Sequence, residues 1–118
     1  MFLELNHQKL EVYKASKNLL VECYKLSHRL PDYEKFGMAS QIRRVALSNL
    51  LNIAEGASRK SETERKRFFE IARGSVIEID AALEAAEALD YLKAYSLGKL
   101  EIYLQSSFRL ISGLIKSR

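Results

Sequence analysis

The feature that most constrains this fold is the near absence of residues that interrupt helices. Only one proline, Pro31, and five glycines occur in 118 residues. Proline lacks a backbone donor and glycine costs about 1 kcal/mol inside a helix, so a chain this poor in both favours long helices. The sequence also lacks the alternation of apolar and polar residues that is typical of strands. It therefore predicts an all-α protein.

Apolar residues recur at intervals of three and four along four segments, which predicts four helices. These segments cover residues 7–29, 35–57, 61–92 and 96–116. Pro31 disfavours helix at the residue before it, while Ser61 and Glu64 have the S-x-x-E spacing of a capping box at the start of the third segment. The connections are short, so neighbouring helices should be antiparallel. We expect one domain, residues 1–118, folded as an antiparallel up-down-up-down four-helix bundle.

Two glycines inside these segments need an explanation. Gly56 lies near the end of the second segment, where glycine commonly caps a helix C-terminus. Gly74 lies in the middle of the third segment, where close packing against another helix would offset its low helix propensity. A kink or a ligand contact at Gly74 is the alternative. We therefore predict a cap at Gly56 and a close helix contact at Gly74.

The second segment carries two apolar faces. Its core stripe includes Ile42, Val45 and Ile53. A second stripe is formed by Leu47, Leu50, Leu51 and Ala54. Monomers usually avoid exposing an apolar patch of this kind, so we expect burial against another copy of the chain in a homo-oligomer. A wide core stripe under tight packing within one copy is the alternative.

The same segment, residues 40–56 (SQIRRVALSNLLNIAEG), keeps polar side chains among its apolar ones. Asn49 lies on the core stripe and Asn52 borders it, and a buried amide without a partner costs about 1–3 kcal/mol. We therefore expect both asparagines to bond to neighbouring helices and to fix the register of the bundle, as a buried asparagine does in coiled coils. Ser48 and Glu55 flank Asn52 and complete one polar seam.

Basic side chains gather at one end of the predicted bundle. In an up-down-up-down bundle the turn between the second and third helices lies at the same end as both termini. That end collects Lys9, Arg59, Lys60, Arg65, Lys66, Arg67, Lys116 and Arg118. Few acidic residues at that end could neutralise these charges. The end is therefore strongly basic, although the net charge of the whole chain is only +4. With no aromatic residue in the stretch RKSETERKR, this end suits a phosphate backbone better than stacked bases, and a merely solvated helix end is the alternative.

Arg43 and Arg44 lie nearer the opposite, acidic end of the second segment. Pairing with Glu84 or Glu87 is one interpretation, and contact with phosphate is the other. Both arginines are therefore candidates for the nucleic-acid-binding set, together with the basic residues of the stretch 59–67.

No arrangement of catalytic residues is apparent. The sequence contains neither a glycine-rich phosphate loop nor G-x-S-x-G. Glu4 and His7 have the Glu-x-x-His spacing of bundle di-iron sites, but such sites need a second pair, and His28 has no glutamate three residues before it. Cys23, the single cysteine, lies among apolar residues and is expected in the core. We expect no enzyme activity, no cofactor and no metal.

The sequence also bears on cellular location. The N-terminal residues lack the basic start and apolar run of a signal peptide. No stretch of about eighteen apolar residues occurs, so no membrane-spanning helix is expected. We expect a cytoplasmic protein that does not bind membranes.

Short motifs follow one another at specific spacings along the chain. They are Phe36–Gly37, Gln-Ile-Arg-Arg at 41–44, Asn-Ile-Ala-Glu-Gly at 52–56, Arg59 with Ser61, and Ile-Ala-Arg-Gly-Ser at 71–75. With LEVYKASKNLL near the start and LISGLIKS near the end, the chain resembles over essentially its whole length the bacterial four-helix-bundle family named for 23S rRNA intervening sequences. Many relatives carry Ile-Pro-Ser or Ile-Pro-Ala before Asn-Ile-Ala-Glu-Gly, whereas residues 49–51 here are Asn-Leu-Leu, which predicts a straighter second helix.

The resemblance implies an antiparallel bundle that assembles as a homo-oligomer, a pentameric ring, with no established activity. Members are encoded within insertions in 23S ribosomal RNA genes and elsewhere, and nucleic-acid binding is the function usually proposed for them. We therefore expect a non-enzymatic homo-oligomer that binds RNA or DNA through its basic end. The alternative is a protein-interaction scaffold, because a similar bundle acts as an accessory to reverse transcriptases in diversity-generating retroelements.

Overall fold

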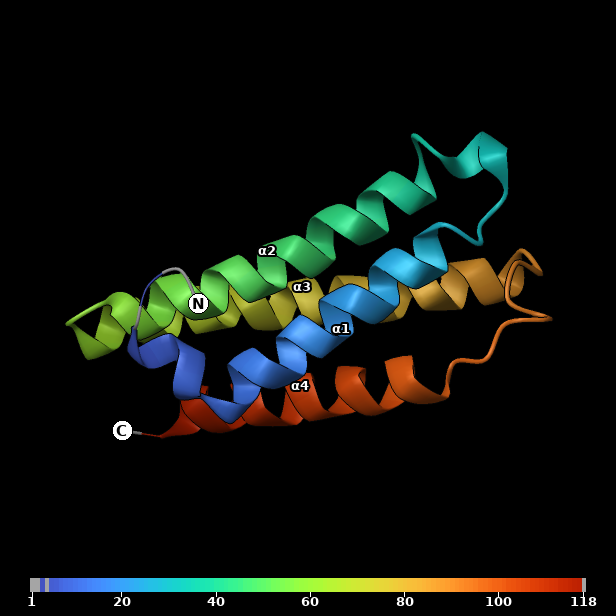
Figure 1. Cartoon of the computed structure of the whole chain (residues 1–118). Helices are drawn as coiled ribbons and strands as arrows, with labels where there is room; N and C mark the ends of the chain where they lie inside the picture. The colour runs from blue at the N-terminus through green and yellow to red at the C-terminus, as the bar shows by residue number, and fades with distance from the viewer. Residues whose placement is uncertain (1–2, 4, 118) are drawn as a thin grey trace.

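Four α-helices dominate the computed structural model, which describes residues 3 and 5–117 (Figure 1). They are α1 (Glu11–Ser27), α2 (Met38–Ser58), α3 (Glu62–Ala88) and α4 (Gly98–Lys116). Two short 3-10 helices, η1 (Asn6–Lys9) and η2 (Asp32–Glu34), precede α1 and α2. No strand occurs in these residues, which confirms the predicted all-α class. Glu4, Arg118 and the side chain of Lys9 lie outside what is described.

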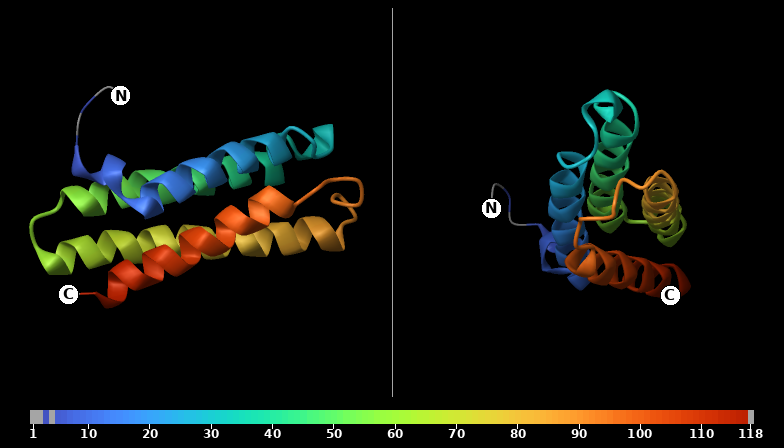
Figure 2. Two further views of the ribbon diagram at one scale, coloured as in Figure 1. Left: turned by 60° about the horizontal axis from the view of Figure 1, so that its bottom comes forward. Right: turned by 90° about the vertical axis from the view of Figure 1, so that its right-hand side faces the viewer.

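Successive helices run in opposite directions, so η1, the α2–α3 turn and the end of α4 lie together at one end (Figure 1). Viewed along the bundle, α1 and α3 lie at opposite corners, with α2 and α4 between them (Figure 2, right). Accordingly, α1 and α3 each pack against both α2 and α4. The described residues form an elongated up-down-up-down bundle that measures 44 × 29 × 24 Å.

The core runs along the axis of the bundle and takes apolar side chains from all four helices. Leu19, Ile42, Ile79 and Ile111 are each completely buried. Full burial of one such side chain contributes about 1.5–3 kcal/mol, so this core is the main source of stability. Cys23 on α1 is also completely buried, as predicted for a small core residue.

The first two helices begin later than predicted. Leu10 has an extended backbone (ψ 136°) and separates η1 from α1, so the helix predicted over residues 7–29 is interrupted near its start. α2 begins at Met38 rather than at residue 35, and its N–H donates to Glu34 Oε1 at 3.0 Å. An acceptor from before the helix thus satisfies one of its free N–H groups. From there α2 continues to Ser58 without the interruption that a proline introduces.

α3 starts as predicted but ends earlier. Ser61 Oγ accepts a hydrogen bond from the Glu64 N–H at 3.0 Å, which caps the N-terminus. The helix ends at Ala88 instead of near residue 92. Asp90 adopts φ 64°, the left-handed conformation that closes many helices, and the Tyr91 N–H reaches back to the helix. Glycine or asparagine usually occupies this position, so an aspartate offered no cue in the sequence.

Gly56 and Gly74 have roles opposite to those predicted. Gly56 lies inside α2 without a positive φ, and Arg59 is the C-cap residue. A Cβ at Gly56 would lie 2.8 Å from Phe69 Cε1 and 3.1 Å from Phe68 Cβ, so the missing side chain lets α3 approach α2. A Cβ at Gly74 would have no neighbour within 4 Å, so no other helix packs against this position.

Candidate nucleic-acid interface and assembly surface

The turn between α2 and α3 carries most of the predicted phosphate-binding residues. The name basic end is used here for Arg59, Lys60, Arg65, Lys66, Arg67 and Lys116. α2 ends at Ser58 and Ser61 caps α3, so the chain reverses within three residues. Arg65 stabilises this reversal, because its Nη1 donates to the Arg59 carbonyl oxygen at 3.0 Å and to that of Lys60 at 2.7 Å. The Arg65 guanidinium therefore stabilises the turn and is less available to an anion.

Arg59 is also engaged within the chain. It forms an ion pair with Glu55, which the sequence placed in the polar seam, and its Cζ lies 4.9 Å from the centroid of the Phe68 ring. Arg67 approaches the same ring, with its Cζ 5.5 Å from the centroid. Such cation–π contacts orient an exposed guanidinium and contribute about 0.5–1 kcal/mol. The sequence interpretation did not foresee that Phe68 contacts these arginines, and the only cue to that role is its position directly after Arg67.

The remaining basic residues fall into two groups. Lys66 Nζ lies 3.9 Å from Glu62 Oε2, so its charge is partly neutralised. Lys60, Arg67 and Lys116 are exposed, and none of them forms an ion pair with another described residue. These three are the cations of the basic end that remain available to an anion.

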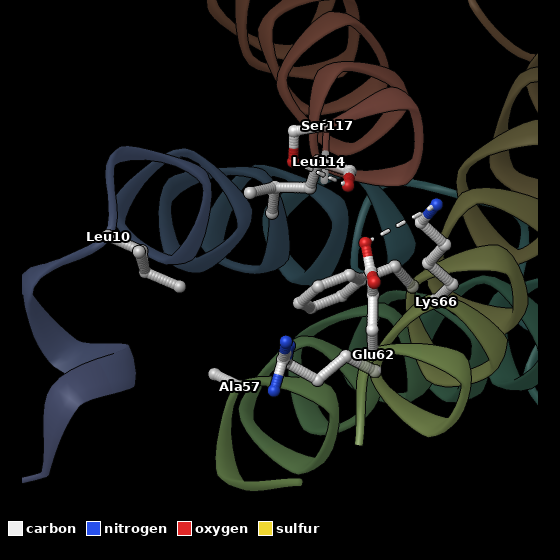
Figure 3. Close-up of a pocket in the computed structure, with 8 residues that line it drawn as sticks. Leu10, Ala57, Glu62, Lys66, Leu114 and Ser117 are labelled. Atoms are coloured by element: carbon white, nitrogen blue, oxygen red, sulfur yellow. Dashed lines mark hydrogen bonds and ion pairs between the residues drawn. The ribbon is translucent and has the colours of Figure 1, made fainter. Parts of the chain in front are cut away.

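A pocket of about 240 Å³ opens beside these residues, at the end of the bundle (Figure 3). Its apolar lining consists of Leu10, Ala57, Phe69 and Leu114. Glu62 and Lys66 stand together at its side, and the dashed line in Figure 3 marks their contact. Lys66 faces a carboxylate and Arg65 is bonded to backbone oxygens, so both cations among the described residues that line the pocket have partners. The pocket is a gap at the open end of the bundle, and the described residues that line it provide no further phosphate-binding site.

Arg43 and Arg44 are separated from the basic end. They precede the α2–α3 turn by about fifteen residues, which is about 23 Å along a helix. Arg43 is half-buried and its Nη1 donates to Ser27 Oγ at 3.3 Å, while Arg44 is exposed. Neither arginine forms an ion pair with Glu84 or Glu87. The structure therefore does not bring the seven predicted nucleic-acid-binding residues onto one surface.

Polar side chains of α2 form a seam with α3 near the middle of the bundle. Asn49 is completely buried, and its Nδ2 donates to the Ala72 carbonyl oxygen of α3 at 3.0 Å. Ser75 Oγ on α3 donates to Ser48 Oγ at 3.2 Å. Asn52 differs from the prediction, because its Nδ2 donates to the Ser48 carbonyl oxygen at 2.8 Å within the same helix. Asn49 thus links two helices and Asn52 does not.

The second apolar stripe of α2 is narrower than predicted. Leu47 and Leu51 are 39% and 56% exposed, so they stand on the outer face of α2. Leu50 is only 8% exposed and is buried within the four-helix bundle. The reason is geometric, because consecutive helical residues lie about 100° apart and one leucine of the three turns toward the bundle. Ile71 on α3 is exposed as well.

The described residues with potentially reactive side chains form no catalytic or metal-binding arrangement. Burial, with a smaller effect of Glu22, raises the pKa of the Cys23 thiol to about 12, so it stays protonated and unreactive at neutral pH. The Glu4–His7 spacing cannot be followed, because Glu4 lies outside the described residues. Within the part of the chain that the structure describes, no group of three His, Cys, Asp or Glu residues is placed to hold a metal ion. Nor is any described helix both long and apolar enough to cross a membrane.

Comparison with known protein families identifies a match that covers most of the chain. Residues 8–113 match the family described as 23S rRNA-intervening sequence protein. No curated protein matches the chain. The matched range includes all of α1, α2 and α3 and most of α4, and the all-helical bundle agrees with the resemblance drawn from the motifs between residues 36 and 75. The chain therefore belongs to the 23S rRNA-intervening sequence protein family.

Proposed function

We propose that the protein is a non-enzymatic homo-oligomer that binds the phosphate backbone of RNA or DNA through its basic end. The observation that carries this proposal is the set of exposed cations Lys60, Arg67 and Lys116, which have no counter-ion among the described residues. The fold gathers them from the α2–α3 turn, the start of α3 and the end of α4 (Figure 1). The family description refers to ribosomal RNA, which supports a nucleic acid as the polyanion.

The two engaged arginines support this surface indirectly. Arg65 holds the carbonyl oxygens of the turn and so fixes the backbone that carries Lys60. Phe68 lies under Arg59 and Arg67 and restrains both guanidinium groups. A restrained cation loses less conformational entropy when it meets a phosphate. Binding of this kind depends on charge and shape and reads little sequence.

Self-association would multiply the basic surface. Leu47 and Leu51 stand exposed on α2, and Ile71 stands exposed on α3. Monomers usually avoid such a patch, so we infer that copies of the chain cover it. In a closed ring all equivalent ends face the same rim. A ring of five copies, as the family resemblance implies, would place five basic ends side by side.

The decisive experiment compares two double charge reversals. Lys60→Glu with Arg67→Glu alters the basic end, and Lys35→Glu with Lys99→Glu makes the same charge change at the opposite end of the bundle. Fluorescence polarisation with structured RNA and with duplex DNA is measured over a series of salt concentrations. On duplex DNA, each lost phosphate contact should reduce the log–log salt slope by about 0.9, so the basic-end variant should lose up to about two units of slope for each copy of the chain that contacts the DNA.

Light scattering on the wild-type protein tests the oligomer directly, with five times the protomer mass of 13.5 kDa as the expected result. The absence of binding at micromolar protein in low salt would reject the nucleic-acid role. In that case a pull-down that retains protein partners after nuclease treatment would favour the scaffold alternative. An equal loss of affinity in both double variants would mean that total charge matters and that the basic end is not the site.

A further inference from the structure

Two apolar surfaces occupy different sides of the bundle. The first, called the ridge, is the outer face of α2 formed by Arg44, Leu47 and Leu51. The second, called the groove, is a hollow of about 380 Å³ between α3 and α4. The groove is lined by Val76, Ile77, Asp80, Leu104, Gln105 and Phe108. Ile77 and Phe108 are 52% and 41% exposed, so both surfaces present large apolar side chains to solvent.

The charged side chains that line the two surfaces have opposite signs, and one cation, Arg73, lies beside the groove with its Cζ 6.0 Å from the centroid of the Phe108 ring. The groove continues toward the start of α4, where a second hollow of about 150 Å³ shares Asp80 and Leu104 with it. The carboxylates along these two hollows are Asp80, Glu84, Glu87 and Glu101, and none of them forms an ion pair with another described residue. Arg44 on the ridge is likewise without an ion pair among the described residues.

The two surfaces also lie at the same height along the bundle. In the sequence, Ser48 lies between the two ridge leucines. Its Oγ accepts a hydrogen bond from Ser75, the residue directly before Val76, and this bond marks a common height on α2 and α3. Because α2 and α3 are antiparallel, Arg44 and Asp80 both lie beyond this bond in the same direction. The offsets are about 6 Å for Arg44 and about 7.5 Å for Asp80, at 1.5 Å per helical residue.

We propose that the groove of one copy receives the ridge of a second copy. Leu47 and Leu51 then pack on Ile77 and Phe108, and the Arg44 guanidinium faces the Asp80 carboxylate. This inference rests on the proposed homo-oligomer and specifies its interface. A contact between two different patches is head-to-tail, and such contacts make rings where the rotation closes and filaments where it does not. The equal heights of ridge and groove leave no step along the axis, which favours a ring.

The first test uses charge. Arg44→Glu and Asp80→Arg each place like charges across the interface, and each should weaken association by at least about tenfold. A chain that carries both substitutions restores opposite charges and should recover the wild-type mass in light scattering. All three variants change exposed residues, and circular dichroism checks that their helical content is kept. Val21→Asp is the control, because Val21 on α1 is 49% exposed yet belongs to neither surface.

The second test separates a head-to-tail contact from a symmetric one. Leu51→Asp removes the ridge, and Phe108→Asp removes the groove. Each variant alone should be monomeric, but an equal mixture keeps one intact ridge and one intact groove and should form dimers of twice 13.5 kDa. A ridge-to-ridge contact would be lost with Leu51→Asp and kept with Phe108→Asp, which would overturn the proposal.

Two further outcomes are distinct. A wild-type protein that stays monomeric rejects the homo-oligomer, and the interface falls with it. A wild-type oligomer that keeps its mass in the Asp80→Arg and Phe108→Asp variants rejects this interface only, and the homo-oligomer stands. In that second case the groove belongs to another occupant, such as a basic amphipathic helix of a different protein.

Discussion

α3 packs in contrasting ways on its two neighbours. On the α2 side, Gly56 makes room for Phe69, and the buried Asn49 reaches the backbone of α3. On the α4 side, a hollow of about 380 Å³ stays open, with Ile77 and Phe108 partly exposed along it. One side of α3 is therefore closely packed within the chain, while the other retains exposed apolar surface.

If the groove is the proposed interface, α3 serves folding on one side and association on the other. Close approach and a buried amide demand one relative position of α2 and α3, because any shift would break the hydrogen bond and press Phe69 against the backbone. An open apolar groove makes no such demand, and it gains free energy only when something covers it. We therefore expect substitutions on the α2 side to change stability and substitutions on the α4 side to change association.

The largest effect is expected at the buried amide. Asn49→Asp places a carboxylate beside the Ala72 carbonyl oxygen, away from water, and an uncompensated buried charge costs about 3–5 kcal/mol. Asn52→Asp is the matched control, since Asn52 is only half-buried and bonds within its own helix. Urea unfolding measures both. An equal loss of unfolding free energy in the two variants would show that the hydrogen bond from Asn49 to α3 adds no more stability than a bond within one helix.

A smaller and opposite pair of effects is expected at the glycines. Gly56→Ala should lower the free energy of unfolding by about 1–2 kcal/mol, because overpacking against Phe69 outweighs the gain in helix propensity. Gly74→Ala should raise the free energy of unfolding by up to about 1 kcal/mol, since a Cβ added there would meet no atom within 4 Å beyond the local helix backbone. Thermal and urea unfolding report both signs. If Gly56→Ala stabilised the protein instead, Phe69 could move aside at little energetic cost.

The smallest effect concerns the far end of the α2–α3 pair. The Tyr91 hydroxyl donates to Glu34 Oε2 at 2.9 Å, and the other Glu34 oxygen caps α2. Interaction with Tyr33, then burial and the Glu34 carboxylate, raise the pKa of Tyr91 above its ordinary 10.0. A raised pKa in the folded state adds stability that is complete below the unfolded pKa and is lost as the pH rises through the folded pKa.

Tyr91→Phe should therefore flatten the decline of the unfolding free energy above pH 10. Urea titrations at a series of alkaline pH values measure this slope. The exposed Val21 of α1 provides the control variant, Val21→Ala, which changes no titratable group and should keep the wild-type slope. An unchanged slope in Tyr91→Phe would show that ionisation of Tyr91 adds nothing to the pH dependence.

Helical content, the start of α3 and the buried Cys23 could all be predicted from the sequence. Each depends on neighbours along the chain, such as the spacing of Ser61 and Glu64 that creates the cap. The end of α3 escaped prediction because Asp90 takes a backbone conformation that aspartate adopts only occasionally. The break at Leu10 escaped it because the apolar spacing continues through that residue.

The candidate site was predicted less completely. Topology and charge alone predict that basic residues gather at one end of the bundle, but they do not predict which side chains or carbonyl oxygens these residues contact. Arg65 turns back onto the carbonyl oxygens of the turn, and Arg59 faces Glu55, so Lys60 and Arg67 differ from them in availability. Side-chain partners depend on rotamers and on the path of the turn, and the order of residues does not specify either.

The sequence by itself determined that the chain forms helices, that these helices are amphipathic and that α2 has more apolar residues than one core stripe needs. Only the tertiary structure decided that Leu50 turns inward while Leu47 and Leu51 stay outside, and that Gly56 rather than Gly74 meets a neighbouring helix. The physical reason is that periodicity is a property of one helix. The rotation and height of each helix result from the packing of all four together.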